Sequence, residues 1–189
     1  MLFRSSPKAG FLWKLTPAST LRGAYTRSLS GVSLDQSYQL EPSQIAGFNQ
    51  SWRGLIPESV VGSQAGARLE MGSLEWDHTF RSETYVAVRG EIGRSRVNRQ
   101  VGVFELPFFA EASSTPEALD FKETTLSVTL DQLVGQDVAL GANYRLTYSR
   151  LEDGYPQIPG SVPHLFPPYQ LRPQQTLEST LHQLELFAV

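Results

Sequence analysis

The chain has 189 residues, with 16 Lys and Arg against 19 Asp and Glu and a net charge of −3. This weak charge argues against a nucleic-acid partner. The absence of cysteine excludes a disulfide framework, a cysteine-type zinc site and a cysteine nucleophile.

The first residues do not form a secretory signal, because Arg4 and Pro7 interrupt any apolar core. We therefore expect residues 1–8 to be a disordered or non-native start, and the chain to be a piece whose natural beginning lies upstream. No apolar run reaches the roughly 18 residues that a membrane-spanning helix needs.

Alternation with period two, which is typical of β-strands, recurs along the whole chain. In the segment 67–80, Leu69 and Met71 share one parity whereas Leu74 and Trp76 share the other, which predicts a bulge near Gly72 and Ser73. The expected strands occupy residues 9–15, 20–29, 67–80, 84–94, 121–131, 138–149 and 180–189.

Short and long connections alternate between these strands. Turns are expected at 16–19, 81–83 and 133–137, and long loops at about 30–66, 95–120 and 150–179. Bacterial outer-membrane barrels show the same rhythm, with strands of about 9–11 residues. Large aromatic residues near the expected strand ends match an interfacial belt, namely Trp13, Trp76 and Phe80 beside short turns and Tyr25 and Tyr148 beside long loops.

We therefore predict an all-β fold, an antiparallel meander of about seven long strands in one domain covering 1–189. It would form part of an up-and-down transmembrane β-barrel, and an open curved sheet if alone. Seven is an odd number, whereas single-chain bacterial barrels use even numbers of strands, so the count also favours a fragment.

The alternation assigns side chains to the two faces of such a wall. The residues expected to face lipid are Val86, Val88, Ile92, Leu126, Val128, Leu130, Leu140, Tyr144 and Leu146. The polar residues expected to face the lumen are Arg22, Arg89, Glu91, Asn143 and Arg145. There they could line a channel or contact a plug, although paired arginines also satisfy the ordinary need for polar residues inside a barrel.

Two other interpretations remain open. A secreted or surface β-sandwich that binds carbohydrate or protein also alternates, and it would cover the apolar residues with a second sheet. A surface hydrolase, which is a weaker alternative, would need two facing carboxylates in a concave site.

Several segments resemble the C-terminal barrel of TonB-dependent receptors and related barrels, including those that follow tetratricopeptide repeats. The resemblance runs from about Trp13 to the C-terminus. Its motifs are Leu40-Glu41-Pro42, Glu70-x-Gly72 with Leu74, Trp76 and Phe80, the strand-like stretch LRGAYTRS at 21–28, and QIAGFNQ at 44–50.

The resemblance implies a component of the bacterial outer membrane with a transport, receptor or pore role. Its expected partners are outer-membrane lipid, an N-terminal plug or repeat domain of the same protein, and a small-molecule substrate that the residues do not identify. The long loops carry aromatic residues expected to be exposed and to face a ligand, namely Phe48, Trp52, Phe104, Phe108, Phe109, Tyr155, Phe166 and Tyr169.

Motifs that carry chemistry are missing from the sequence. His78, His164 and His182 lack the spacing of metal ligands, and neither a phosphate-binding glycine loop nor a Gly-x-Ser-x-Gly elbow occurs. We therefore predict no catalytic, cofactor or metal residue, and a protein that is not an enzyme.

Overall fold

The computed structural model describes residues 6–29, 44–49, 67–105, 111–135, 137–158 and 173–189. All regular structure in these residues is β-strand, and they contain no helix long and apolar enough to cross a membrane. The strands are β1 (Lys8–Thr16), β2 (Ser19–Leu29), β3 (Gln44–Ile45), β4 (Phe48–Asn49), β5 (Arg68–Thr79), β6 (Thr84–Glu105), β7 (Glu111–Val134), β8 (Val138–Gly154) and β9 (Gln174–Ala188).

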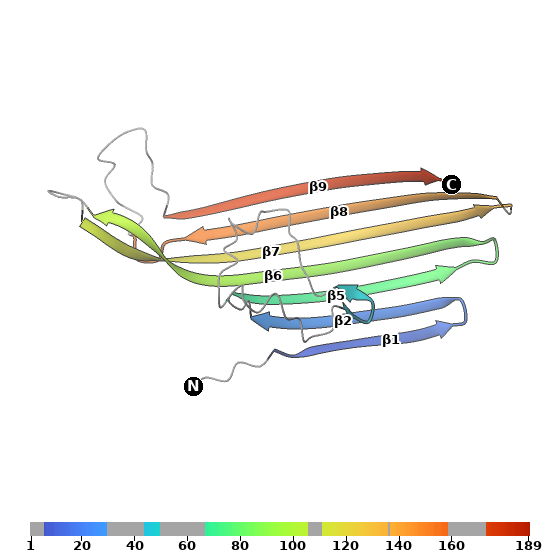
Figure 1. The fold of residues 1–189 in the computed structure, drawn as a ribbon, viewed down its shortest axis with the longest axis horizontal. Helices are drawn as coiled ribbons and strands as arrows, with labels where there is room; N and C mark the ends of the chain where they lie inside the picture. Colours follow the sequence, from blue (N-terminus) through green and yellow to red (C-terminus); the bar gives the residue numbers. More distant parts are fainter. Residues whose placement is uncertain (1–5, 30–43, 50–66, 106–110, 136, 159–172) are drawn as a thin grey trace.

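Seven strands form one antiparallel meander in the order β1-β2-β5-β6-β7-β8-β9, in which each strand pairs with the next strand of this sheet along the chain. This confirms the predicted all-β meander. Figure 1 shows a single layer of long, gently curved strands with the three short turns gathered at one end, which we call the turn end. The opposite end is the loop end. The sheet is not closed, and β1 and β9 are its edges.

The turns follow the sequence prediction closely. Pro17 and Ala18 join β1 to β2, and Gly135 lies in the connection from β7 to β8 with a φ of 70°. In the turn between β5 and β6, the amide of Phe80 donates to the carbonyl of Thr84 at 2.8 Å. These tight connections explain why neighbouring strands are antiparallel and in register.

The expected loop across 95–120 is wrong. Strands β6 and β7 have 22 and 24 residues and stay paired from Thr84 and Gln132 to Glu105 and Glu111. In Figure 1 this two-stranded arm extends beyond its neighbours at the loop end. Strand β8 likewise continues to Gly154, and β9 begins at Gln174, so the third loop is shorter than expected.

The first expected loop contains a small second sheet formed by β3 and β4. The rest of that loop lies outside the described residues, as do residues 1–5, while Lys8 already belongs to β1.

The bulge expected near Gly72 and Ser73 is also wrong. The register between β5 and β6 is continuous from Arg68 opposite Arg96 to Thr79 opposite Tyr85. Leu69 and Leu74 therefore point to opposite faces of an unbroken strand, because side chains alternate along a strand. Among the seven strands of the large sheet, the register shifts only between Lys14 and Thr16, at the end of β1.

Directly opposed residues share a face of a sheet, so the register defines two faces. Face A carries Val86, Leu126 and Leu146, and face B carries Glu75 and Arg89. The buried side chains of β5–β8 all lie on face B. They are Glu75, Ala87, Ser95, Val97, Thr115, Glu117, Leu119, Phe121, Glu123, Thr147, Ser149 and Leu151.

Candidate functional site

The register places the predicted residues consistently. The nine apolar residues expected to face lipid all lie on face A, and the five polar residues expected to face a lumen all lie on face B. That face A contacts lipid and face B a lumen stays a prediction.

The apolar side chains change face at one height in four adjacent strands. Toward the turn end, β5–β8 place most of their large apolar residues on face A, such as Leu74, Val88, Val128 and Leu146, with Leu133 as an exception on face B. Beyond the transverse row formed by Gly72, Ile92, Thr124 and Tyr148, the large apolar residues lie on face B instead. They are Leu69, Met71, Val97, Leu119, Phe121 and Leu151.

This inversion explains why the pattern of apolar residues in β5 predicts a bulge that is absent. The strand is regular, and only the face that carries its apolar residues changes. At the loop end, Ala67, Val97, Leu119, Phe121 and Leu151 form a buried apolar cluster on face B, with Phe121 0% exposed. At the turn end the corresponding apolar surface on face A stays open. Its exposed members are Phe11, Trp13, Tyr25, Leu74, Ile92, Leu126, Leu130, Leu140, Tyr148, Leu184 and Leu186.

The exposed apolar surface, which we call the apolar band, has definite limits. On β8 it runs from Val138 to Tyr148, roughly 34 Å of strand at about 3.4 Å per residue. A strand tilted by about 35–45°, as in membrane barrels, would cross a layer about 25 Å thick over this length.

Aromatic rings line both limits of the apolar band. Tyr25 and Tyr148 lie in the same transverse row, at the limit of the band nearer the loop end. Near the turn end, the imidazole of His78 stacks on Trp76 with ring centroids 5.9 Å apart and meets the ring of Phe80 edge-on at 4.4 Å. His78 is thus part of an aromatic row.

Face B carries a row of arginines at a level that lies within the apolar band. Arg22, Glu75, Arg89, Ser127 and Arg145 are register partners on β2, β5, β6, β7 and β8. Glu75 is 3% exposed and pairs with both neighbouring guanidinium groups; Arg22 Nε donates to its Oε1 at 3.0 Å.

The hairpin of β3 and β4 covers this row. The ring of Phe48 is 3% exposed and lies 5.9 Å from the guanidinium carbon of Arg22 and 5.1 Å from that of Arg89. Both distances suit cation–π attraction. Phe48 was expected as an exposed loop aromatic, and this expectation is wrong because the hairpin folds back onto face B.

The hairpin turn depends on one glycine. Ala46 and Gly47 have φ values of 50° and 84°, as a two-residue turn of type I′ requires. A Cβ added at Gly47 would lie 2.7 Å from Nη1 of Arg22. Gly47 therefore permits both the turn and its close approach to the arginine.

We expect Gly47→Val to detach the hairpin, because a β-branched residue at this φ is strained by about 1–3 kcal/mol and also collides with Arg22. Hydrogen exchange of the amides of residues 44–49 should become faster. The control is Gly102→Val, because a Cβ at Gly102 meets nothing within 4 Å. Unchanged exchange in Gly47→Val would show that the hairpin does not depend on this contact.

A second polar cluster lies on face B beyond the height of the apolar band. A hydrogen bond from Arg99 lowers the pKa of Glu117, and Tyr155 donates to its Oε1 at 3.0 Å. Burial, together with the charge of Glu117, raises the pKa of Asp153. Oδ1 of Asp153 has no hydrogen-bond partner in the described part of the chain.

The raised pKa of Asp153 means that the folded chain binds this proton more tightly than the unfolded chain. Its stabilising contribution is therefore present at acidic pH and is lost as pH rises through the folded pKa. We expect Asp153→Asn to raise stability near neutral pH by at most about 1 kcal/mol, since solvent partly screens the group. Urea unfolding across the pH range measures this, with the exposed Asp137→Asn as control. A loss of stability at neutral pH would contradict the assignment.

The described residues contain no group of three or more His, Cys, Asp and Glu that could hold a metal ion. Of the two other histidines, His182 lies on β9 with its Nδ1 2.8 Å from the hydroxyl of Tyr144, and His164 is outside the described residues. Of the other predicted lumen residues, Glu91 accepts from Ser73 at 3.3 Å, and Asn143 contacts the hydroxyl of Thr129 at 3.4 Å.

Sequence reasoning missed Glu75, Phe48 and Glu117 as members of these clusters. Glu75 could have been found from its parity on β5, had the strand been taken as unbroken. Comparisons with known proteins do not assign a family, since no family model, curated protein or solved structure matches the chain.

Proposed function

We propose that this chain forms part of the wall of a β-barrel in a bacterial outer membrane, as a transport, receptor or pore component without catalytic activity. The observation that carries the proposal is the inversion of the apolar face at one height across β5–β8. A strand in a soluble sheet keeps its apolar side chains on the face that packs against the core. An inversion is expected where a wall leaves lipid and enters water.

Three further features support the proposal. The apolar band would span a layer about 25 Å thick, as in membrane barrels. Aromatic rows lie at both limits of this band. The face opposite the band carries the polar row of Arg22, Glu75 and Arg89 on β2, β5 and β6, as expected for the water-filled interior of a barrel.

The sandwich alternative would need a second sheet over face A. Within the described ranges, the only other sheet is the hairpin of β3 and β4, and it contacts Arg22 and Arg89 on face B. We also propose, from the sequence motifs, that the barrel is of the TonB-dependent receptor type. In this proposal, face B meets a plug or repeat domain and a small-molecule substrate.

Refolding tests the proposal. We expect the chain to gain β-sheet circular dichroism only with detergent micelles or lipid vesicles, and its folded form to migrate differently on a gel before and after heating. Proteolysis of vesicle-bound protein should spare the band segments of β5–β8. Isolation of the chain as a compact monomer in buffer without detergent would contradict the proposal.

A further inference from the structure

Three cations stand side by side on face A just beyond the apolar band. Arg94 on β6 is directly opposite Lys122 on β7, and Lys122 is directly opposite Arg150 on β8. Like charges in directly opposed positions destabilise a sheet. An arrangement of this kind is therefore expected where an anion lies against the row.

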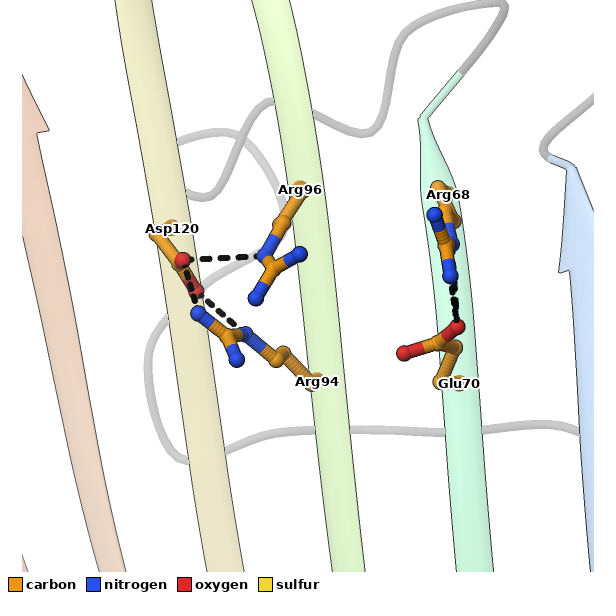
Figure 2. Close-up of polar contacts among 5 residues, drawn as sticks. All are labelled: Arg68, Glu70, Arg94, Arg96 and Asp120. Atoms are coloured by element: carbon orange, nitrogen blue, oxygen red, sulfur yellow. Dashed lines mark hydrogen bonds and ion pairs between the residues drawn. The ribbon is translucent and has the colours of Figure 1, made fainter.

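Carboxylates of the sheet neutralise these cations only in part. Figure 2 shows Arg94 and Arg96 converging on Asp120, and Arg68 beside Glu70. Burial would raise the pKa of Asp120, but hydrogen bonds from the two arginines lower it below its usual range. Thus one carboxylate is shared by two guanidinium groups.

The same sharing occurs on β5, where Glu70 pairs with both Arg68 and Arg27, the latter at 3.5 Å. The guanidinium group of Arg150 lies 2.8 Å from the carboxylate of Glu152 and 3.7 Å from that of Glu178. Lys122, in the middle of the cation row, is exposed and makes no ion pair with any residue in the described ranges. The row of Arg94, Lys122 and Arg150 and the next row along the strands, which holds Arg68, Arg96, Asp120 and Glu152, together contain six cations and four carboxylates. The chain as a whole, in contrast, has a net charge of −3.

The height of the cation row identifies the kind of anion. Arg94 and Arg150 lie two residues along their strands from Ile92 and Tyr148, which end the apolar band. Two residues correspond to roughly 7 Å of strand. In a bilayer, lipid headgroups occupy the layer directly outside the hydrocarbon, and clusters of Lys and Arg at that level bind anionic headgroups.

There is also room for a headgroup beside the row. A hollow of about 490 Å³ lies beside the next row along the strands, lined in part by Arg68, Arg96, Asp120 and Glu152. The guanidinium groups of Arg68 and Arg96 carry hydrogen-bond donors that suit phosphate oxygens.

We propose that Arg94, Lys122 and Arg150 form a binding site for the phosphate of an anionic lipid headgroup, with Lys122 at its centre. This proposal rests on the proposed membrane location of face A. The lipid phosphate supplies a negative charge to Lys122 and supplements the carboxylates that pair with Arg94 and Arg150, and it fixes the depth of the sheet in the bilayer.

Vesicles of two compositions test the site: phosphatidylcholine alone, and phosphatidylcholine mixed with phosphatidic acid. We expect phosphatidic acid to stabilise the folded chain against urea, and native mass spectrometry to show it retained in preference to phosphatidylcholine. Lys122→Gln should lower that preference about fivefold, since a basic residue near the surface contributes about 1 kcal/mol. Lys122→Gln should also stabilise the chain slightly in phosphatidylcholine alone, because it relieves the repulsion between neighbouring cations.

The control is Lys14→Gln, which removes the same charge from face B on the edge strand β1. It should leave the preference for phosphatidic acid unchanged. If Lys14→Gln and Lys122→Gln behave alike, the site does not exist. If inorganic phosphate in solution gives the same stabilisation in phosphatidylcholine vesicles, the site binds a free anion and the lipid assignment is wrong.

Failure of the underlying function would look different. A chain that does not enter either kind of vesicle overturns the membrane proposal and this site with it. A chain that inserts equally well into both, with no preference for phosphatidic acid, overturns the site alone.

Discussion

Phe121→Ala should lower the free energy of unfolding by about 3–5 kcal/mol, the usual cost of truncating a buried aromatic ring. Phe121 lies at the centre of the apolar cluster on face B and has no exposed surface, with Leu119 two residues away on β7 and Leu151 directly opposite on β8. A single-layer sheet has few such positions, so its loss removes much of the packing at the loop end.

Two variants make this prediction specific, and urea unfolding in detergent measures all three. Phe121→Leu keeps most of the apolar volume and should cost much less. Leu177→Ala removes a leucine from the same transverse row, but on the edge strand β9, where it is 40% exposed. We expect its cost to be below about 1 kcal/mol. Equal costs for Phe121→Ala and Leu177→Ala would show that the cluster is not a core.

The strands that the sequence predicted well share one property. In 84–94, 121–131 and 138–149 the Val, Leu and Ile residues keep one parity, so period two identifies both the strand and its two faces. The tight turns between them were equally readable, because Pro17 and Gly135 fall where a chain reversal needs them.

The outer halves of β6 and β7 were missed for a physical reason. Beyond Arg94 the large apolar residues change parity and become sparse, as in the stretch SRVNRQ at 95–100. A pattern search that expects one apolar face interprets such a stretch as a loop. The same change of parity in β5 was taken for a bulge, although the strand is regular.

The contacts on face B could not be predicted from strand patterns. The contact of the Phe48 ring with Arg22 and Arg89 depends on the β3–β4 hairpin folding back across the sheet, which strand periodicity does not encode. The sharing of Glu75 by two arginines depends on the register of three strands. The sequence thus predicted the seven-stranded sheet and its two faces, but not the contacts between the β3–β4 hairpin and face B.

The sharpest test of where face A lies is Leu126→Arg. Leu126 is 42% exposed and lies inside the apolar band, two residues from the row that ends it, between Gly90 on β6 and Leu146 on β8. In water, replacing so exposed a side chain would change stability by no more than about 0.5 kcal/mol. An arginine facing lipid costs about 2–4 kcal/mol at the midplane of a bilayer and less toward its surfaces, so at Leu126 we expect a cost of about 1–3 kcal/mol.

The adjacent residue provides the matched control. Ser127 follows Leu126 on β7 but faces the other side, in the row that contains Arg89 and Arg145. If face B borders water, Ser127→Arg should be tolerated better than Leu126→Arg, apart from some repulsion by the two arginines. Unfolding by urea in lipid vesicles gives both free energies, and a second measurement in detergent micelles checks that the chain still folds.

The difference between the two variants carries the argument, because both introduce the same residue at neighbouring positions of one strand. A soluble sheet with water on face A would tolerate Leu126→Arg and would be disturbed at least as much by Ser127→Arg. A membrane wall reverses that order. Beyond the limit of the apolar band, where Lys122 already occupies face A, arginine should be tolerated on both faces. The position along β7 at which the difference between the faces disappears would therefore mark the edge of the layer that the sheet crosses.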